Sequence, residues 1–322
     1  MAAALYDAEA GYYARGARIG EPGDFVTSPT VSPAFARTIA HEFRREVAGL
    51  EGPLEFVEAG AGDGRFLEEF AAALGSESPE LAARVRLTAI ERSSLARGSL
   101  RQRGLPGPPR VLESAGELAE RSVRGWIFSN ELFDALPVVR VEGSEEGLRE
   151  LRVGMDPERF VWVSAAAPEA WGKLLASFGV TLAPGQAGEI SLDAAVLYRS
   201  LARALARGAL VTFDYGHRAS VLYHAFARPR GSLAVHFGGR SGGDPLERPG
   251  EVDLTAHVNW DDLARAGEAE GLSTRGIFRQ GSYLSRAGLL DFAASDSEKW
   301  RAYRLIDPEG MGEELSVLIQ TR

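Results

Sequence analysis

The sequence predicts an α/β protein built on a mostly parallel, doubly wound sheet, with an inserted antiparallel meander and a flap. Three observations carry this prediction. From Leu54 onward, short apolar segments alternate with segments of helical periodicity, as parallel strands joined by crossover helices require. The first apolar segment runs into a glycine-rich turn and then a helix. The chain has 322 residues, of which 45% are hydrophobic and 25% charged, which is enough for a large buried core.

The elements follow in order along the chain. Residues 11–29 are rich in glycine, aromatic residues and turn formers, so we expect an ordered loop. A helix is expected to begin at Ser32-Pro33, because serine is a good N-cap and proline suits the first helical position. The alternating region then predicts strands at 54–58, 85–91, 110–112, 125–130 and 209–214, and helices at 65–74, 93–103 and 193–207.

Two insertions interrupt this pattern. Three stretches of alternating hydrophobicity, at 138–141, 148–153 and 160–163, predict an antiparallel meander. Residues 228–250 are loaded with glycine, proline and arginine and predict a mobile flap with no core of its own. A helix at 260–270 and strands at 273–278 and 315–321 complete the chain.

The turn after the first strand reads Glu58-Ala-Gly-Ala-Gly-Asp-Gly64. Glycine at Gly60, Gly62 and Gly64 lets the backbone turn sharply and lets a ligand lie against the main chain. This acid-x-Gly-x-Gly-x-Gly spacing differs from the dinucleotide spacing Gly-x-Gly-x-x-Gly and favours S-adenosyl-L-methionine (SAM) as cofactor. The methionyl carboxylate would lie at the helix N-terminus, and the ammonium would lie near Glu58 or near main-chain carbonyls beside it. A plain tight loop is the alternative.

Further residues are candidates for binding this cofactor. Glu91 ends the second strand, where an acid can accept hydrogen bonds from both ribose hydroxyls. An exposed surface acid is the alternative interpretation of Glu91. The loop 23–29 is expected to close over the cofactor, with Asp24 and Thr27 as contacts.

Three residues at strand ends are candidates for catalysis. Asn130 ends the fourth strand, Glu131 follows it and Asp214 ends the fifth, so all three should lie at the ligand-binding edge of the sheet. The carboxylate of Glu131 could hold a guanidinium group and accept its proton. Alternatively, Asn130 caps the next helix. His217 could be a general base, although a lone histidine after a turn is more often a surface residue.

Composition excludes several classes of function. The net charge of −9 argues against nucleic-acid binding and is compatible with a basic protein or peptide partner. The absence of cysteine excludes disulfides, thiolate metal sites and a cysteine nucleophile, and the five histidines lack metal-binding spacing. We see neither a signal sequence nor an apolar run long enough for a membrane, and we therefore expect a cytoplasmic protein.

Five sequence blocks have the order of a known family. They are Leu5-Tyr-Asp with Gly11-Tyr-Tyr, Gly23-Asp-Phe-Val-Thr-Ser-Pro29, Asn130-Glu-Leu-Phe-Asp-Ala-Leu-Pro137, Asp214-Tyr-Gly216, and Pro249-Gly-Glu-Val-Asp-Leu-Thr-Ala-His-Val258. In these blocks the chain resembles the MidA-type SAM-dependent methyltransferases, from about Leu5 to Phe292. That family includes the mitochondrial complex I assembly factor that methylates an arginine.

The resemblance implies a class I (Rossmann-like) methyltransferase fold, SAM as cofactor and a protein arginine as methyl acceptor. This chain departs from the family pattern at Ala61, where proline is more frequent, and in the flap, where the histidine is displaced. A small-molecule O- or N-methyltransferase and a non-catalytic SAM-binding assembly or chaperone module therefore stay open as alternatives. The partner is an acceptor protein or a small-molecule substrate, and a homodimer is a further alternative.

We accordingly divide the chain into two parts. Residues 1–50 form an N-terminal loop and helix that cover the cofactor. Residues 51–322 form the Rossmann-like methyltransferase domain, with insertions at about 138–165 and 217–250.

Overall fold

The computed structural model describes residues 1–14 and 27–322, which fold into two compact units. Unit 1 comprises Met1–Ala17, Phe133–Val196 and Tyr215–Arg265. Unit 2 comprises Arg18–Leu132, Leu197–Asp214 and Ala266–Arg322. Unit 1 thus contains both predicted insertions, 138–165 and 217–250, in full. The boundary predicted at residue 50 was drawn between a cofactor-covering segment and the catalytic domain, and it does not coincide with a boundary between the compact units. The cofactor-covering role of residues 1–50 stays a prediction.

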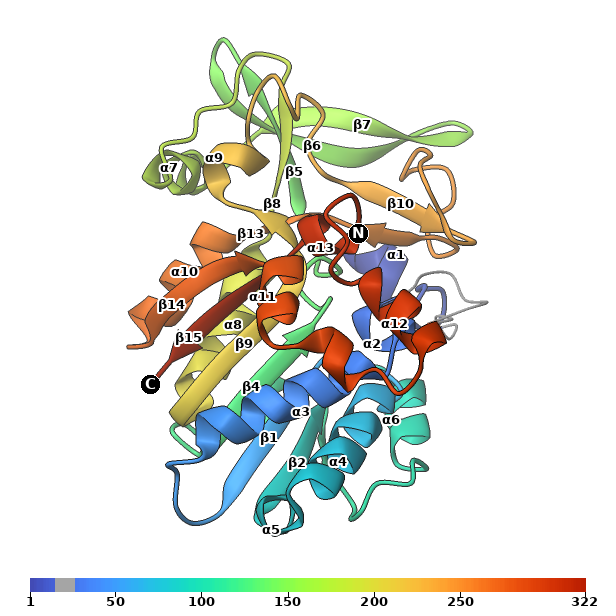
Figure 1. Ribbon diagram of the computed structural model, residues 1–322. Helices are drawn as coiled ribbons and strands as arrows, with labels where there is room; N and C mark the ends of the chain where they lie inside the picture. The colour runs from blue at the N-terminus through green and yellow to red at the C-terminus, as the bar shows by residue number, and fades with distance from the viewer. Residues whose placement is uncertain (15–26) are drawn as a thin grey trace. The chain divides into compact units, whose positions relative to one another are not determined.

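Unit 2 is organised around a mainly parallel sheet, as the sequence predicts (Figure 1). Its strand order is β14-β15-β9-β4-β1-β2-β3, and β3, β2, β1, β4 and β9 are parallel neighbours. The closing pair β14–β15 is antiparallel. The strands are β1 (Leu54–Ala59), β2 (Val85–Ile90), β3 (Arg110–Leu112), β4 (Val123–Asn130), β9 (Leu205–His217), β14 (Ser273–Arg279) and β15 (Leu315–Thr321).

Helices connect these strands. Those of unit 2 are α2 (Ser28–Val31), α3 (Ala34–Val47), α4 (Arg65–Glu77), α5 (Pro79–Ala82), α6 (Ser94–Leu100), α11 (Gln280–Arg286), α12 (Asp296–Tyr303) and α13 (Met311–Glu314), with the 3₁₀ turns η1 (Ala115–Glu117) and η2 (Leu289–Phe292). Like β9, helices α8 (Leu192–Ala204) and α10 (Trp260–Ala269) have residues in both units. No helix among the described residues has both the length and the apolar character to span a membrane.

A cluster of phenylalanine rings forms the core between α3, α4 and the sheet. Phe56 on β1 stacks on Phe70 of α4 with ring centroids 3.8 Å apart, and Phe66 of α4 stacks on Phe128 of β4 at 4.7 Å. All four rings are at most 4% exposed. Aromatic rings of this size supply a large buried area together with defined packing geometry, and they therefore hold β1 and β4 side by side under the two helices.

Unit 1 contains the predicted meander, in which β5 (Val139–Ser144), β6 (Gly147–Asp156) and β7 (Arg159–Ala166) pair antiparallel. A strand that the sequence did not predict, β8 (Ala187–Ile190), extends this sheet to the order β7-β6-β5-β8. The other elements of the unit are α1 (Ala2–Tyr6), α7 (Glu169–Ser177), α9 (Ala219–Leu222), β10 (Ala234–Phe237), β11 (Arg240–Ser241), β12 (Asp253–Thr255) and β13 (Val258–Asn259).

Three sequence expectations are corrected by the structure. The predicted flap 228–250 contains β10 and β11 and buries Val235, which is 6% exposed, so the segment does have apolar packing. The helix predicted at 193–207 ends at Ala204, because the fully buried Leu205 begins β9 and pairs with Val123 of β4. The helix expected from residue 32 begins at Ala34, whose N–H donates to the Ser32 hydroxyl.

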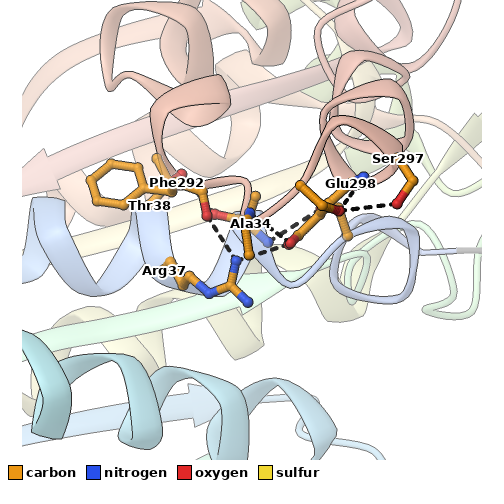
Figure 2. A network of polar contacts seen from close by, with 9 residues as sticks. Ala34, Arg37, Thr38, Phe292, Ser297 and Glu298 are labelled. Carbon is orange, nitrogen blue, oxygen red and sulfur yellow. Dashed lines mark hydrogen bonds and ion pairs between the residues drawn. The ribbon is translucent and has the colours of Figure 1, made fainter.

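A polar network joins the start of α3 to α12 and η2 in unit 2 (Figure 2). The guanidinium of Arg37 donates to the Phe292 carbonyl at 2.7 Å and to Glu298 Oε1 at 2.9 Å. The Ser32 hydroxyl also donates to Glu298 Oε1, and the Ala294 N–H donates to Glu298 Oε2 at 2.8 Å. Glu298 is only 5% exposed, so its charge is matched by donors from two segments distant in sequence.

We expect Glu298→Ala to lower the free energy of unfolding by about 2 kcal/mol, because it removes the common acceptor of the buried Ser32 hydroxyl, the Arg37 guanidinium and the Ala294 N–H. Urea unfolding measures this change. Glu42→Ala is the matched control, since it removes the partner of the mostly exposed Arg45 on the same helix α3 and should cost less than about 1 kcal/mol. Equal losses in the two variants would contradict a structural role for the network.

Candidate functional site

The glycine turn between β1 and α4 requires glycine for two separate reasons. Gly60, Gly62 and Gly64 all have positive φ, at 75°, 54° and 81°, a conformation that other residues rarely adopt. A Cβ atom would also lie 2.9 Å from Leu132 Cδ1 at Gly60 and 2.8 Å from Leu100 Cγ at Gly64. The turn is therefore tight as well as left-handed, and the first N–H group of α4, that of Arg65, donates to Asp63 Oδ1 at 3.1 Å.

Glu91 lies beside this turn. Its Oε2 accepts a hydrogen bond from the Gly62 N–H at 2.9 Å, and its Oε1 accepts one from the Ser93 N–H at 2.7 Å. The carboxylate is half-buried and held by main chain on both sides. The interpretation of Glu91 as a mere surface acid is therefore wrong, and the structure brings it together with the glycines as predicted.

Glu58, at the end of β1, is a buried acid that lacks a full set of partners. It is 4% exposed, and its Oε2 has no hydrogen-bond partner among the described residues. Burial, followed by the nearby charges of Asp63 and Glu91, raises the pKa of the Glu58 carboxyl well above its usual range. Such a carboxylate favours a cationic donor, because an approaching positive charge would stabilise its ionised form.

These residues fit the predicted cofactor. At Gly62 no side chain separates the main chain from a ligand, Glu91 can accept the hydrogen bonds of a ribose, and the unpartnered oxygen of Glu58 can accept from an ammonium group. The ammonium group that Glu58 can hold belongs to SAM and is absent from a dinucleotide, whereas the ribose is common to both.

Glu131 follows β4 in a strained conformation. Its φ is +50°, in the left-handed region that non-glycine residues rarely occupy, and its N–H donates to the Phe213 carbonyl at 2.9 Å. Its Oε1 accepts from the Ser28 N–H and from the Asn130 side-chain amide, each at 2.9 Å. Burial raises the pKa of the Glu131 carboxyl to about 7, although these hydrogen bonds oppose the shift. Strain of this kind persists where surrounding contacts hold a side chain in one direction.

Asn130 and Asp214 support this arrangement. Asn130 donates to Glu131, while its own Oδ1 is buried without a hydrogen-bond partner among the described residues. No helix begins in the residues that follow Asn130 directly, so its alternative role as a helix cap is wrong. Asp214 is fully buried, and its Oδ2 accepts from the Leu132 N–H at 3.1 Å, which fixes the turn that carries Glu131.

The N-terminal loop contributes a residue that the sequence analysis missed. Thr27 caps α2 in a reciprocal hydrogen-bonded pair with Thr30, and the next residue, Ser28, reaches Glu131 through its N–H. Ser28 is fully buried, with its hydroxyl donating to Gln280. The sequence could have indicated Ser28, because it lies in the loop 23–29 that we predict to cover the cofactor. Asp24 lies outside the described residues.

Unit 1 holds a second group of polar rings. His217 contacts the guanidinium of Arg228, so it is not the isolated surface residue considered from the sequence. The rings of His217 and His257 lie 5.3 Å apart, and Tyr215 stacks on His257. Burial, followed by the charges of Arg228 and the neighbouring histidines, lowers the pKa of His257 to about 3, so this ring is neutral at physiological pH. Within the described part of the chain, no group of three or more His, Asp or Glu side chains could hold a metal ion.

Comparisons with known proteins show the family of this chain. Residues 34–278 match the model of a family described as putative S-adenosyl-L-methionine-dependent methyltransferases. The mitochondrial protein arginine methyltransferase NDUFAF7 of Mus musculus is 27% identical over 94% of this chain and 75% of its own, and that of Danio rerio is 28% identical over 97% and 80%.

Two solved structures are similar over the whole chain. A Burkholderia thailandensis protein bound to S-adenosyl-homocysteine is 30% identical, with a TM-score of 0.88 over 100% of this chain and 86% of its own. A second B. thailandensis structure is 28% identical, with a TM-score of 0.86 over 100% and 85%. The chain therefore belongs to the MidA-type family of SAM-dependent methyltransferases, as an enzyme with a class I fold that uses SAM as its cofactor.

Proposed function

We propose that this enzyme transfers a methyl group to a guanidinium nitrogen of an arginine in a partner protein, by direct in-line displacement, with Glu131 holding the acceptor. The observation that carries the proposal is the Glu131 carboxylate, buried at the end of β4 and fixed by Ser28 and Asn130. The names of the relatives, which are protein arginine methyltransferases, give independent support.

Arginine presents a specific chemical difficulty. A guanidinium with a pKa above about 12 stays protonated and is a poor nucleophile. A carboxylate that binds two of its nitrogens draws the positive charge away from the third, which can then attack. When bound, SAM supplies an electrophilic methyl group whose sulfur leaves as a neutral thioether. The new nitrogen–carbon bond raises the acidity of the nitrogen, and Glu131 then accepts the released proton.

The neighbouring residues suit this role for Glu131. The unpartnered Oδ1 of Asn130 can accept a hydrogen bond from an N–H of the acceptor, which would orient it beside the carboxylate. Asp214 acts through the turn, because its Oδ2 holds the N–H of Leu132, the residue that follows Glu131. We therefore regard Glu131 as the catalytic residue and Asp214 as a positioning residue. The cytoplasmic location expected from the sequence stays a prediction, and the relatives are named mitochondrial.

Gly62→Val should weaken binding of S-adenosyl-homocysteine by about 10-fold to 100-fold, because valine is strained at the positive φ of this turn. Calorimetry measures the affinity. Gly107→Val is the matched control, since a Cβ at Gly107 meets nothing within 4 Å and its φ is not left-handed. Unchanged affinity in a folded Gly62→Val protein would show that the cofactor binds elsewhere.

Labelled methyl from SAM should enter the protein fraction of a lysate and be recovered as methylarginine after hydrolysis. Glu131→Gln keeps the size of the side chain but removes its charge, and it should lower turnover by about 10²-fold while sparing cofactor affinity. Label found only in small molecules would favour the small-molecule methyltransferase instead. Cofactor binding without any transfer would favour the non-catalytic assembly module. Full activity of Glu131→Gln together with an inactive Asp214→Asn would reverse the two roles.

The rate should also depend on pH. Because the Glu131 carboxyl has a raised pKa of about 7, it is protonated below that pH and can neither hold a guanidinium nor accept a proton. We therefore expect kcat/KM for the protein acceptor to rise as the pH increases through about 7 and then to level off. Arginine does not titrate in this range. The rising limb should disappear in Glu131→Gln, and its persistence there would assign it to another group.

A further inference from the structure

Strand β7 lies at the edge of the four-stranded sheet of unit 1. It is eight residues long and, among the described residues, pairs only with β6. Its other side therefore presents a row of main-chain N–H and C=O groups. Exposed edge strands of natural proteins are commonly interrupted by charges, proline or bulges. Within β7 the only charged residue is Arg159, at its first position, and its register with β6 is unbroken.

Both faces of the β6–β7 hairpin expose large apolar side chains. On one face, Met155 and Phe160 are paired across the strands and are 75% and 41% exposed, and Val153 beside them is 51% exposed. On the opposite face, Val163 is 47% exposed. Figure 1 shows the hairpin as a long two-stranded arm. Apolar side chains gathered in this way on a free edge are typical of a surface that another chain covers.

The arm is complementary to itself. Two β7 strands can pair antiparallel about a two-fold axis that is normal to the sheet. Such an axis keeps each face of the sheet on its own side, so each residue must pair with a residue of the same face in the second copy. Because side chains alternate between the faces along a strand, an even-numbered residue pairs with an even-numbered one and an odd-numbered residue with an odd-numbered one. The register centred on Trp162 places this ring against its own copy and Val161 against Val163 of the second copy. Only apolar or small side chains then meet at the centre of the contact.

Charges at the ends of β7 fit the same register. Arg159 of one copy lies opposite Ala165 of the second copy. Within the second copy, Ala165 on β7 pairs with Glu150 on β6, so Arg159 points along the sheet toward this glutamate, past a small side chain. At the same end, Glu158 approaches Ala166 of the second copy, behind which Arg149 lies. Symmetry repeats both arrangements, so each end of the interface places opposite charges on the same face of the sheet, two strands apart. Within one copy, Glu150 also pairs with Arg152 and Arg159 with Asp156.

We propose that a second copy of this chain binds along β7, and that the two four-stranded sheets join into one continuous sheet in the dimer. The main-chain hydrogen bonds of two edge strands supply the contact, and the apolar side chains of β7 pack side by side across the junction. This interface is independent of the methyl-transfer chemistry of Glu131.

Analytical ultracentrifugation of the full chain over a range of concentrations tests the proposal. Wild type should sediment as a dimer, and Val163→Lys should raise the dimer dissociation constant by about 10-fold or more, because each lysine meets the second copy near Arg159. Val221→Lys on α9 is the matched control, since Val221 is 48% exposed in the same unit, and it should remain a dimer. A monomeric wild type, or a Val163→Lys dimer of unchanged strength, would overturn the proposal.

Cross-linking tests the register. The chain has no cysteine, so Trp162→Cys introduces a single thiol that lies on the axis, about 4.8 Å from its copy by the strand spacing. A short bis-maleimide should link the two copies of this variant. Val153→Cys on β6 is the control, because its two copies would lie three strand spacings apart, about 14 Å, and should link poorly. Stronger linking in Val153→Cys than in Trp162→Cys would exclude this register.

Discussion

The parallel register of β1, β4 and β9 is the constraint on which the candidate site depends. Ala59 pairs with Ser129, and Asn130 pairs with Phe213. The glycine turn and Glu131 therefore follow β1 and β4 at the same edge of the sheet, and Asp214 lies beside them within β9. The stacked phenylalanines under α3 and α4 hold these strands together. A slip of the register would move the carboxylates away from the turn, whatever their own chemistry.

The site contains groups that are unfavourable in the folded protein by themselves. Glu58 is a buried acid with an unpartnered oxygen, and Glu131 has both a strained φ and a raised pKa. Both costs are tolerated because the aromatic core and the polar network at Glu298 stabilise the surrounding elements. A cationic cofactor and a cationic acceptor would each relieve one of these acids, which connects the energetic cost of the site to the ligands that it favours.

The two units use hydrophobic residues differently. In unit 2 the large apolar residues of β1 and β4 are buried under helices. In unit 1 the sheet is covered near β5, where Val141 is fully buried with Leu175 of α7, but it leaves the far part of β6 and β7 open. Strands β1 and β4 therefore stabilise their own unit, whereas β6 and β7 keep an apolar surface that is available for association with another chain.

Local sequence determined the parts of this protein that depend on short-range chemistry. The glycines at Gly60, Gly62 and Gly64, the acid Glu91 and the alternating strands and helices were all predicted, because turn conformation and hydrophobic period are properties of neighbouring residues. The tertiary structure alone decided which distant groups meet. Ser28 lies 103 positions from the Glu131 that it contacts, and Arg37 lies 261 positions from Glu298. Partners so far apart are chosen by packing of the whole unit, and no local pattern encodes that choice.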